Sequence, residues 1–266
     1  MKIKSLLKRL QLAVWTFKQP LALCPRLSSE VISDLFVWRS DENWQTFFEL
    51  IDISSLFEDG CASRDVRIVF FDPNGQQLLD KRIALNAKKR KSLNVSKIIG
   101  QSHGEHGTFA VFHEAIPRDV TRIGSHLAER GYVSYCYRNA PLKAYVHGNF
   151  DAISKTEDGV LQLLGGVSFL SREYHLQHKI ESGVVYELGL VNPSPQRQKF
   201  LCKLISAANN EVIELSVFEL NPGGAHLFSI QLKDSSEARL IIRSRLIMAR
   251  PIVFRIFNLN LDVFHG

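Results

Sequence analysis

The stretch VRIVFFDPNGQQLLDKRIALN, residues 66–86, decides how this chain folds. Its first six residues are mostly β-branched or aromatic, which is the composition of a buried strand. The tetrapeptide Asp72-Pro73-Asn74-Gly75 then interrupts the run, and alternating apolar and polar residues follow it. Asn-Gly is a strong hairpin signal, because both residues tolerate the positive φ that a tight turn requires. The stretch therefore predicts a β-hairpin.

Short runs of the same kind occur along the rest of the chain. Residues 35–38 and 46–51 are rich in apolar and aromatic side chains, and turn residues separate them. Several short strands at regular spacing are typical of an all-β protein. We therefore expect an all-β fold.

The second half of the sequence repeats the strand and turn pattern of the first half. At a shift of 135 residues, the Asn74-Gly75 turn falls on Asn209-Asn210, and apolar positions of the first half fall on apolar positions of the second. Further matches lie upstream and downstream, and they occur in the same order. The aligned pairs are Leu78 with Ile213, Ile83 with Phe218, Leu85 with Leu220, Leu93 with Phe228 and Val95 with Ile230.

This pattern predicts two tandem immunoglobulin-like β-sandwich domains, preceded by an N-terminal amphipathic helix. The expected boundaries are residues 1–27 for the helix and lead-in, 28–150 for the first sandwich, 151–166 for a glycine-bearing linker and 167–266 for the second sandwich. The apolar strands that end before Asn221-Pro222-Gly223-Gly224 resemble small bacterial β-sandwich modules of the sensory-rhodopsin-transducer type. The resemblance concerns spacing, so it implies a bacterial tandem sandwich and transfers no functional residue.

Composition places the chain among globular proteins. Hydrophobic residues make up 45% and charged residues 23% of the 266 residues, and no stretch approaches the roughly 18 apolar residues of a membrane span. The net charge of +6 favours acidic partners. The four cysteines stand at long, unequal spacings without a Cys-x-x-Cys motif, which predicts reduced thiols and a cytoplasmic protein.

Residues 1–20 combine basic side chains with apolar residues at three- and four-residue steps, from Ile3 to Phe17. Such a helix either lies on an anionic membrane surface as a peripheral contact or packs against the protein itself. Amphipathicity alone does not separate these two alternatives.

Three histidines form the most suggestive cluster for metal chemistry. His103 and His106 flank Glu105 in a glycine-bearing loop, and His113 follows. Imidazole and carboxylate groups are ligands for zinc or iron, but His-x-x-His in a loop lacks the fixed geometry of a helical His-Glu-x-x-His motif. The interpretation that we prefer is a flexible polar loop, with a metal site as the alternative.

Aromatic and polar residues also gather between positions 134 and 149. On a strand, Tyr135 and Tyr137 share one face. If that face is open, it suits stacking on a sugar ring, with neighbouring polar groups bonding the hydroxyls. If it is closed, the tyrosines fill the core. The candidate ligand-binding residues are Tyr135, Arg138, Tyr145, His147 and Asn149.

The run Lys88, Lys89, Arg90 and Lys91 is either a phosphate-binding patch or a solvated basic turn. We favour the turn, because the aligned residues 223–226 of the second half lie between strands. No aromatic side chains are interleaved with the basic ones, which argues against nucleic acid as a partner.

No Gly-x-Ser-x-Gly, Walker or dinucleotide-binding motif occurs. We therefore expect a non-catalytic binding or scaffolding module without a cofactor, whose partner is a carbohydrate, an acidic ligand or another protein. The alternative is a metal-dependent or carbohydrate-active enzyme that uses His103, His106 and His113.

Overall fold

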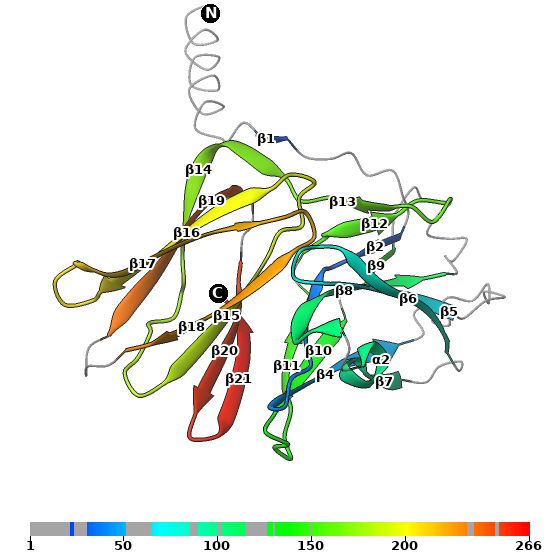
Figure 1. Cartoon of the computed structure of the whole chain (residues 1–266), viewed down its shortest axis with the longest axis horizontal. Coiled ribbons are helices and arrows are strands. Elements are labelled where there is room, and N and C mark those ends of the chain that lie inside the picture. The colour runs from blue at the N-terminus through cyan, green and yellow to red at the C-terminus, as the bar shows by residue number, and fades with distance from the viewer. Residues whose placement is uncertain are drawn as a thin grey trace, which may run out of the picture.

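The computed structural model describes residues 22–23, 31–51, 65–85, 90–100, 103–114, 127–129, 131–148, 150–232, 237–247 and 250–266. Apart from the short helix α2 (Val95–Ile99), its regular elements are β-strands. The expected all-β class is therefore confirmed (Figure 1). The amphipathic helix predicted for the N-terminus lies outside the described residues.

The strands form five small sheets in a propeller-like arrangement. Two of these sheets come from the first half of the chain. One has the order β3-β8-β5-β6, with bounds Phe36–Arg39, His106–His113, Asp65–Phe71 and Gln77–Ala84. The other has the order β11-β10-β4-β7, with bounds Ala144–His147, Tyr132–Tyr137, Trp44–Ile51 and Arg90–Asn94.

Two further sheets come mainly from the second half. The five-stranded sheet has the order β1-β14-β19-β16-β17, with bounds Ala22–Leu23, Val167–His175, Ala238–Leu246, Gln198–Ser206 and Val212–Leu220. Its neighbour has the order β18-β15-β20-β21, with bounds Ala225–Gln231, Val185–Val191, Ile252–Phe257 and Asn260–His265.

The fifth sheet joins segments that are far apart in the sequence. Its order is β13-β12-β2-β9, with bounds Leu161–Leu163, Ile153–Lys155, Val31–Ser33 and Leu127–Glu129. Strand β2 pairs with β9 in parallel, so this sheet is mixed. Strands β12 and β13 also lie within the segment that the sequence suggested as a linker.

The prediction of two tandem immunoglobulin-like sandwiches is wrong, and so is the resemblance to the transducer type. An immunoglobulin-like domain closes two antiparallel sheets over its own core. Here the described residues form five small sheets, and their largest core cluster combines residues of the first half with Ile252 and Phe254 of β20. The local alternation of side chains was read correctly, but it does not specify which sheets share a core.

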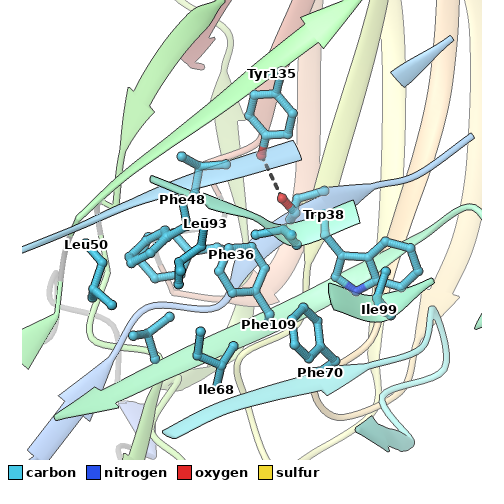
Figure 2. Packing of buried hydrophobic residues seen from close by; sticks show 14 of the residues in the cluster. Phe36, Trp38, Phe48, Leu50, Ile68, Phe70, Leu93, Ile99, Phe109 and Tyr135 are labelled. Atoms are coloured by element: carbon cyan, nitrogen blue, oxygen red, sulfur yellow. Dashed lines mark hydrogen bonds between the residues drawn. The ribbon is translucent and has the colours of Figure 1, made fainter. Parts of the chain in front are cut away.

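The largest core cluster is rich in aromatic residues (Figure 2). Phe36, Phe48 and Phe109 lie with ring centroids 5.0–5.6 Å apart, in tilted or edge-on contact. Trp38 is fully buried, and its Nε1 donates hydrogen bonds to the carbonyl oxygens of Phe71 and Thr108. The indole thus ties β3 to two neighbouring strands while it fills the core.

Candidate functional site

A polar cleft opens where strand β3 turns into β4. Arg39 is the last residue of β3, and residues 40–43 connect it to Trp44 at the start of β4. The turn is held locally, because Asp41 Oδ1 accepts a hydrogen bond of 2.8 Å from the Asn43 backbone N–H. Such an Asx turn is the reason that Asp and Asn are favoured in tight connections.

Two other segments complete the rim of this cleft. The Ser40 N–H donates to the carbonyl oxygen of Glu105 over 2.8 Å, which fixes the loop before β8 against the β3–β4 turn. The Arg138 N–H donates to the Asn43 carbonyl over 2.7 Å, which brings the turn after β10 to the same place. The cleft has a volume of about 600 Å³, within the range of small-molecule sites. We call it the Arg39 cleft, lined by Arg39, Ser40, Asp41, Glu42, Asn43, Trp44, Gly104, Glu105, Tyr137 and Glu187.

Arg39 organises the floor of the cleft. Its guanidinium carbon lies 3.7 Å from the centre of the Trp44 ring, a cation–π contact, and its side chain is only 8% exposed. It forms an ion pair with Glu187 of β15, and its Nη2 lies 3.6 Å from Asp41 Oδ2. A buried guanidinium is tolerated only when carboxylates and aromatic faces replace its hydration. Arg39 therefore links the two halves of the chain at this cleft.

The cleft is acidic and has an aromatic wall. Four carboxylates line it, from Asp41, Glu42, Glu105 and Glu187, against the single guanidinium of Arg39. The Trp44 and Tyr137 rings pack 4.9 Å apart, with Trp44 buried and Tyr137 partly exposed. Carboxylate oxygens accept hydrogen bonds from hydroxyl groups, and an exposed aromatic ring offers an apolar face for stacking. This donor and acceptor set suits a neutral polyhydroxylated ligand better than an anion.

The structure separates His113 from the other two histidines suggested as metal ligands. His106 begins β8 and His113 ends it, so seven residue steps of extended strand, roughly 23 Å, separate them. His113 is buried, with Nε2 2.6 Å from Glu129 Oε2. His103 lies in the loop before β8, three residues ahead of His106. In the described part of the chain, no group of three or more metal-ligating side chains occurs.

His106 instead lies beside the Arg39 cleft, because its Cα pairs with that of Arg39 across β3 and β8. Burial lowers the pKa of His106 below its usual range, and the positive charge of Arg39 lowers it further. An imidazole in this position is neutral at neutral pH, so it acts as a hydrogen-bonding group rather than as a cation.

The suggested tyrosine face is closed at its centre. Tyr135 is fully buried and donates a 2.7 Å hydrogen bond to the Val37 carbonyl oxygen, drawn as a dashed line in Figure 2. Its ring packs edge-on against Phe254. Burial also raises the pKa of its phenol above the usual range. Tyr145 is about half exposed on β11, and Arg138 is exposed in the turn after β10 with φ +48°. Asn149 lies outside the described residues.

His147 lines a second, mainly apolar cavity of about 60 Å³ between the halves. The His265 ring packs edge-on against the His147 ring, and His265 Nε2 lies 2.7 Å from the His147 carbonyl oxygen. Tyr135 lines this cavity together with valine side chains.

The basic run is described only in part, because Lys88 and Lys89 lie outside the described residues. Arg90 begins β7 and its Nε donates a 2.9 Å hydrogen bond to Glu49 Oε2. Lys91 Nζ donates to the Ala84 carbonyl oxygen over 3.2 Å. Arg90 therefore has its partner on the neighbouring strand β4, and Lys91 has its partner on β6 of the other first-half sheet.

Sequence reasoning missed most residues of the Arg39 cleft and singled out only Glu105 and Tyr137 among its charged and aromatic side chains. The signal available was the polar run Ser40-Asp41-Glu42-Asn43 between two tryptophans, Trp38 and Trp44. Nothing local indicated Glu187, which lies 148 residues after Arg39.

Comparisons with known proteins do not identify a family for this chain. No protein-family model matches it. No curated protein matches it either.

Solved structures give only weak similarities. A calcium-binding mutant of a β-glucuronidase from Bacteroides uniformis is 11% identical, with 87% of this chain and 25% of that chain covered and a TM-score of 0.17. The M60 catalytic domain with CBM51 domains from Clostridium perfringens is 10% identical, with 84% of this chain and 36% of that chain covered and a TM-score of 0.19. An oxalate decarboxylase mutant from Bacillus subtilis is 10% identical, with 86% of this chain and 70% of that chain covered and a TM-score of 0.15. This chain spans a quarter of the length of the glucuronidase and about a third of the length of the M60 protein. At these TM-scores the similarity indicates neither a shared fold nor a shared function.

Proposed function

We propose that this protein is a non-catalytic binding module that takes a neutral carbohydrate in the Arg39 cleft. The supporting observation is one cleft of about 600 Å³ that combines four carboxylates with the partly exposed ring of Tyr137. Sugar hydroxyls donate to carboxylates and a sugar ring stacks on an aromatic face. The excess of carboxylates disfavours an acidic ligand at this place, although the whole chain carries a net charge of +6.

The walls of the cleft are held in place before a ligand arrives. Hydrogen bonds join the β3–β4 turn to the loop at Glu105 and to the turn at Arg138. The buried side chain of Arg39 packs on Trp44 and pairs with Glu187. Preorganised polar groups cost little ordering entropy on binding, which is a requirement for recognising a ligand as well hydrated as a sugar.

Localisation in the cytoplasm is part of the same proposal. Cys136 and Cys202 are free, buried thiols in the described part of the chain. Among the helices described, none is long and apolar enough to cross a membrane. Peripheral membrane contact through residues 1–20 stays a prediction from the sequence, because that segment lies outside the described residues.

Ligand-observed NMR with glucose, galactose, maltose and cellobiose tests the proposal. We expect saturation transfer from the protein to the ring protons of at least one of these sugars. Tyr137→Ala should weaken that binding roughly tenfold, because the stacking surface is lost. Asp41→Asn should also weaken it, because a charged acceptor is lost.

Tyr145→Ala is the matched control, since Tyr145 is an exposed tyrosine that does not line the cleft. It should leave sugar binding unchanged. Absence of transfer to all four sugars would overturn the proposal. An equal loss in Tyr137→Ala and Tyr145→Ala would overturn the placement of the ligand in the Arg39 cleft.

A further inference from the structure

Among the described residues, strand β17 forms one edge of the five-stranded sheet and pairs with β16 alone. Figure 1 shows it at the outer margin of that sheet. It is nine residues long, with the sequence VIELSVFEL. An edge strand presents a row of backbone N–H and C=O groups that the sheet itself does not satisfy.

The side chains of this edge are apolar and exposed. The exposed fractions are 56% for Val212, 48% for Ile213, 55% for Leu215 and 50% for Val217. The four consecutive residues 212–215 are all exposed, so both faces of the strand are accessible in this stretch. A long, apolar edge of this kind pairs readily with another strand unless charges or proline prevent it. Strand β17 contains no proline, and its only charged residues are Glu214 and Glu219, on either side of the stretch 215–218.

The corresponding edge in the first half of the chain is built differently. Strand β6 has the outermost place in the order β3-β8-β5-β6, as β17 has in β14-β19-β16-β17. The centre of β6 carries the exposed charges Asp80, Lys81 and Arg82, and its leucines pack against the core. Charged side chains are a common protection of a free edge. The centre of β6 is therefore charged, whereas residues 215–218 at the centre of β17 carry no charge.

We infer that β17 is an association edge, through which two copies of this chain pair antiparallel and form one continuous sheet. A two-fold axis at Ser216 places Leu215 of one copy opposite Val217 of the second copy, and Glu214 opposite Phe218. Parallel pairing in register would instead place each glutamate of one chain beside the same glutamate of the second chain. Antiparallel pairing therefore buries the exposed apolar side chains without opposing like charges.

Charge at the two ends of the strand favours the same arrangement. The turn that leads into β17 carries Glu211, and Glu214 follows it. At the other end, β17 lies beside the start of β16, where the exposed Arg197 and Lys199 outnumber the one carboxylate, Glu219 of β17, with which Arg197 forms an ion pair of 3.3 Å. In an antiparallel pair the acidic end of each copy lies next to the basic end of the other. Opposite charges at the rim of an interface steer two copies into register.

Sedimentation velocity of the full chain over a range of concentrations tests this inference. We expect a monomer–dimer equilibrium for the unchanged protein. Val217→Lys should raise the dimer dissociation constant by at least about tenfold, because a two-fold interface contains the substitution twice. Val160→Lys is the matched control, since Val160 is 62% exposed and lies in the turn between β12 and β13. It should leave the dissociation constant unchanged.

A second variant, Leu215→Lys, tests the same interface if Val217→Lys does not fold. Circular dichroism checks the fold of both variants.

Ser216→Cys tests the register of the two strands. If two Ser216 positions face each other, oxidation should link the copies through a disulfide that the unchanged protein does not form. A protein that is monomeric at all concentrations would overturn the inference. So would a dimer that both lysine variants leave intact.

Discussion

Gly75 lies directly against Pro222: a Cβ atom on Gly75 would lie 1.9 Å from the Pro222 carbonyl oxygen. The two glycine-bearing turns, residues 72–75 and 221–224, thus dock onto each other across the two halves of the chain. The contact includes a 3.0 Å hydrogen bond from the Ala225 N–H to the Pro73 carbonyl oxygen, and Thr108 Oγ1 donates to the Gly223 carbonyl oxygen. Both turns are recognisable from sequence, but their contact is a property of the tertiary structure.

Gly75→Ala should therefore destabilise the protein strongly. Gly75 has φ +80°, and its missing Cβ leaves room for backbone atoms of the second half. Strain and overpacking together should lower the free energy of unfolding by about 2–4 kcal/mol. Gly183→Ala separates the two causes, because Gly183 has φ +76° with nothing within 4 Å of its added Cβ. Urea denaturation should show a loss of only about 1 kcal/mol for that control. Equal losses would contradict the docking of the turns.

The pair of Arg39 and Glu187 should contribute to the association of the two halves. Removing one partner leaves the other poorly compensated, so Arg39→Met and Glu187→Gln should each destabilise the fold. A double-mutant cycle should give an interaction energy of about 1–3 kcal/mol. An interaction energy near zero would show that the pair does not couple β3 to β15. Arg255→Met is a comparison, because Arg255 pairs with Glu181 and Asp262 at the exposed surface.

Stability should fall as the pH drops below neutrality. Burial lowers the pKa of His265, and the positive charge of Arg250 lowers it further. The unfolded state, with a histidine pKa of about 6.5, therefore binds a proton first. The stabilisation is fully present above about pH 6.5 and is lost as the pH falls through the lower pKa of the folded state.

The unfolding free energy of His265→Asn, followed between about pH 7 and 5, should depend less steeply on pH than that of the unchanged protein. Burial also lowers the pKa values of His106 and His226, so part of the dependence should remain. An unchanged slope for His265→Asn would contradict the prediction.

Tyr135→Phe should reduce stability without affecting sugar binding. The substitution removes the hydrogen bond to the Val37 carbonyl oxygen inside a fully buried cluster, which should cost about 1–2 kcal/mol. Thermal unfolding measures the first effect and ligand-observed NMR the second. A loss of sugar binding with unchanged stability would instead indicate that Tyr135 contacts the ligand.

Only part of the candidate site could be predicted from the sequence. Glu105 was named as part of a histidine loop, and it does lie at the rim of the Arg39 cleft. His106 and His113 are separated because a strand extends the chain between them, whereas the sequence suggested a compact loop. Tyr135 and Tyr137 share a face as alternation requires, yet one ring is buried and the other borders the cleft.

The sequence by itself determined that this protein is built from strands. The runs predicted at residues 46–51 and 66–71 correspond to β4 and β5, since alternation and turn residues act over a few positions of the chain. It did not determine how the strands assemble. Five propeller-like sheets and two sandwiches require the same local pattern, and only long-range packing, such as Phe254 against Tyr135, selects between them. The Arg39–Glu187 pair and the docking of Gly75 on Pro222 depend on that packing, because each joins residues that are more than a hundred positions apart.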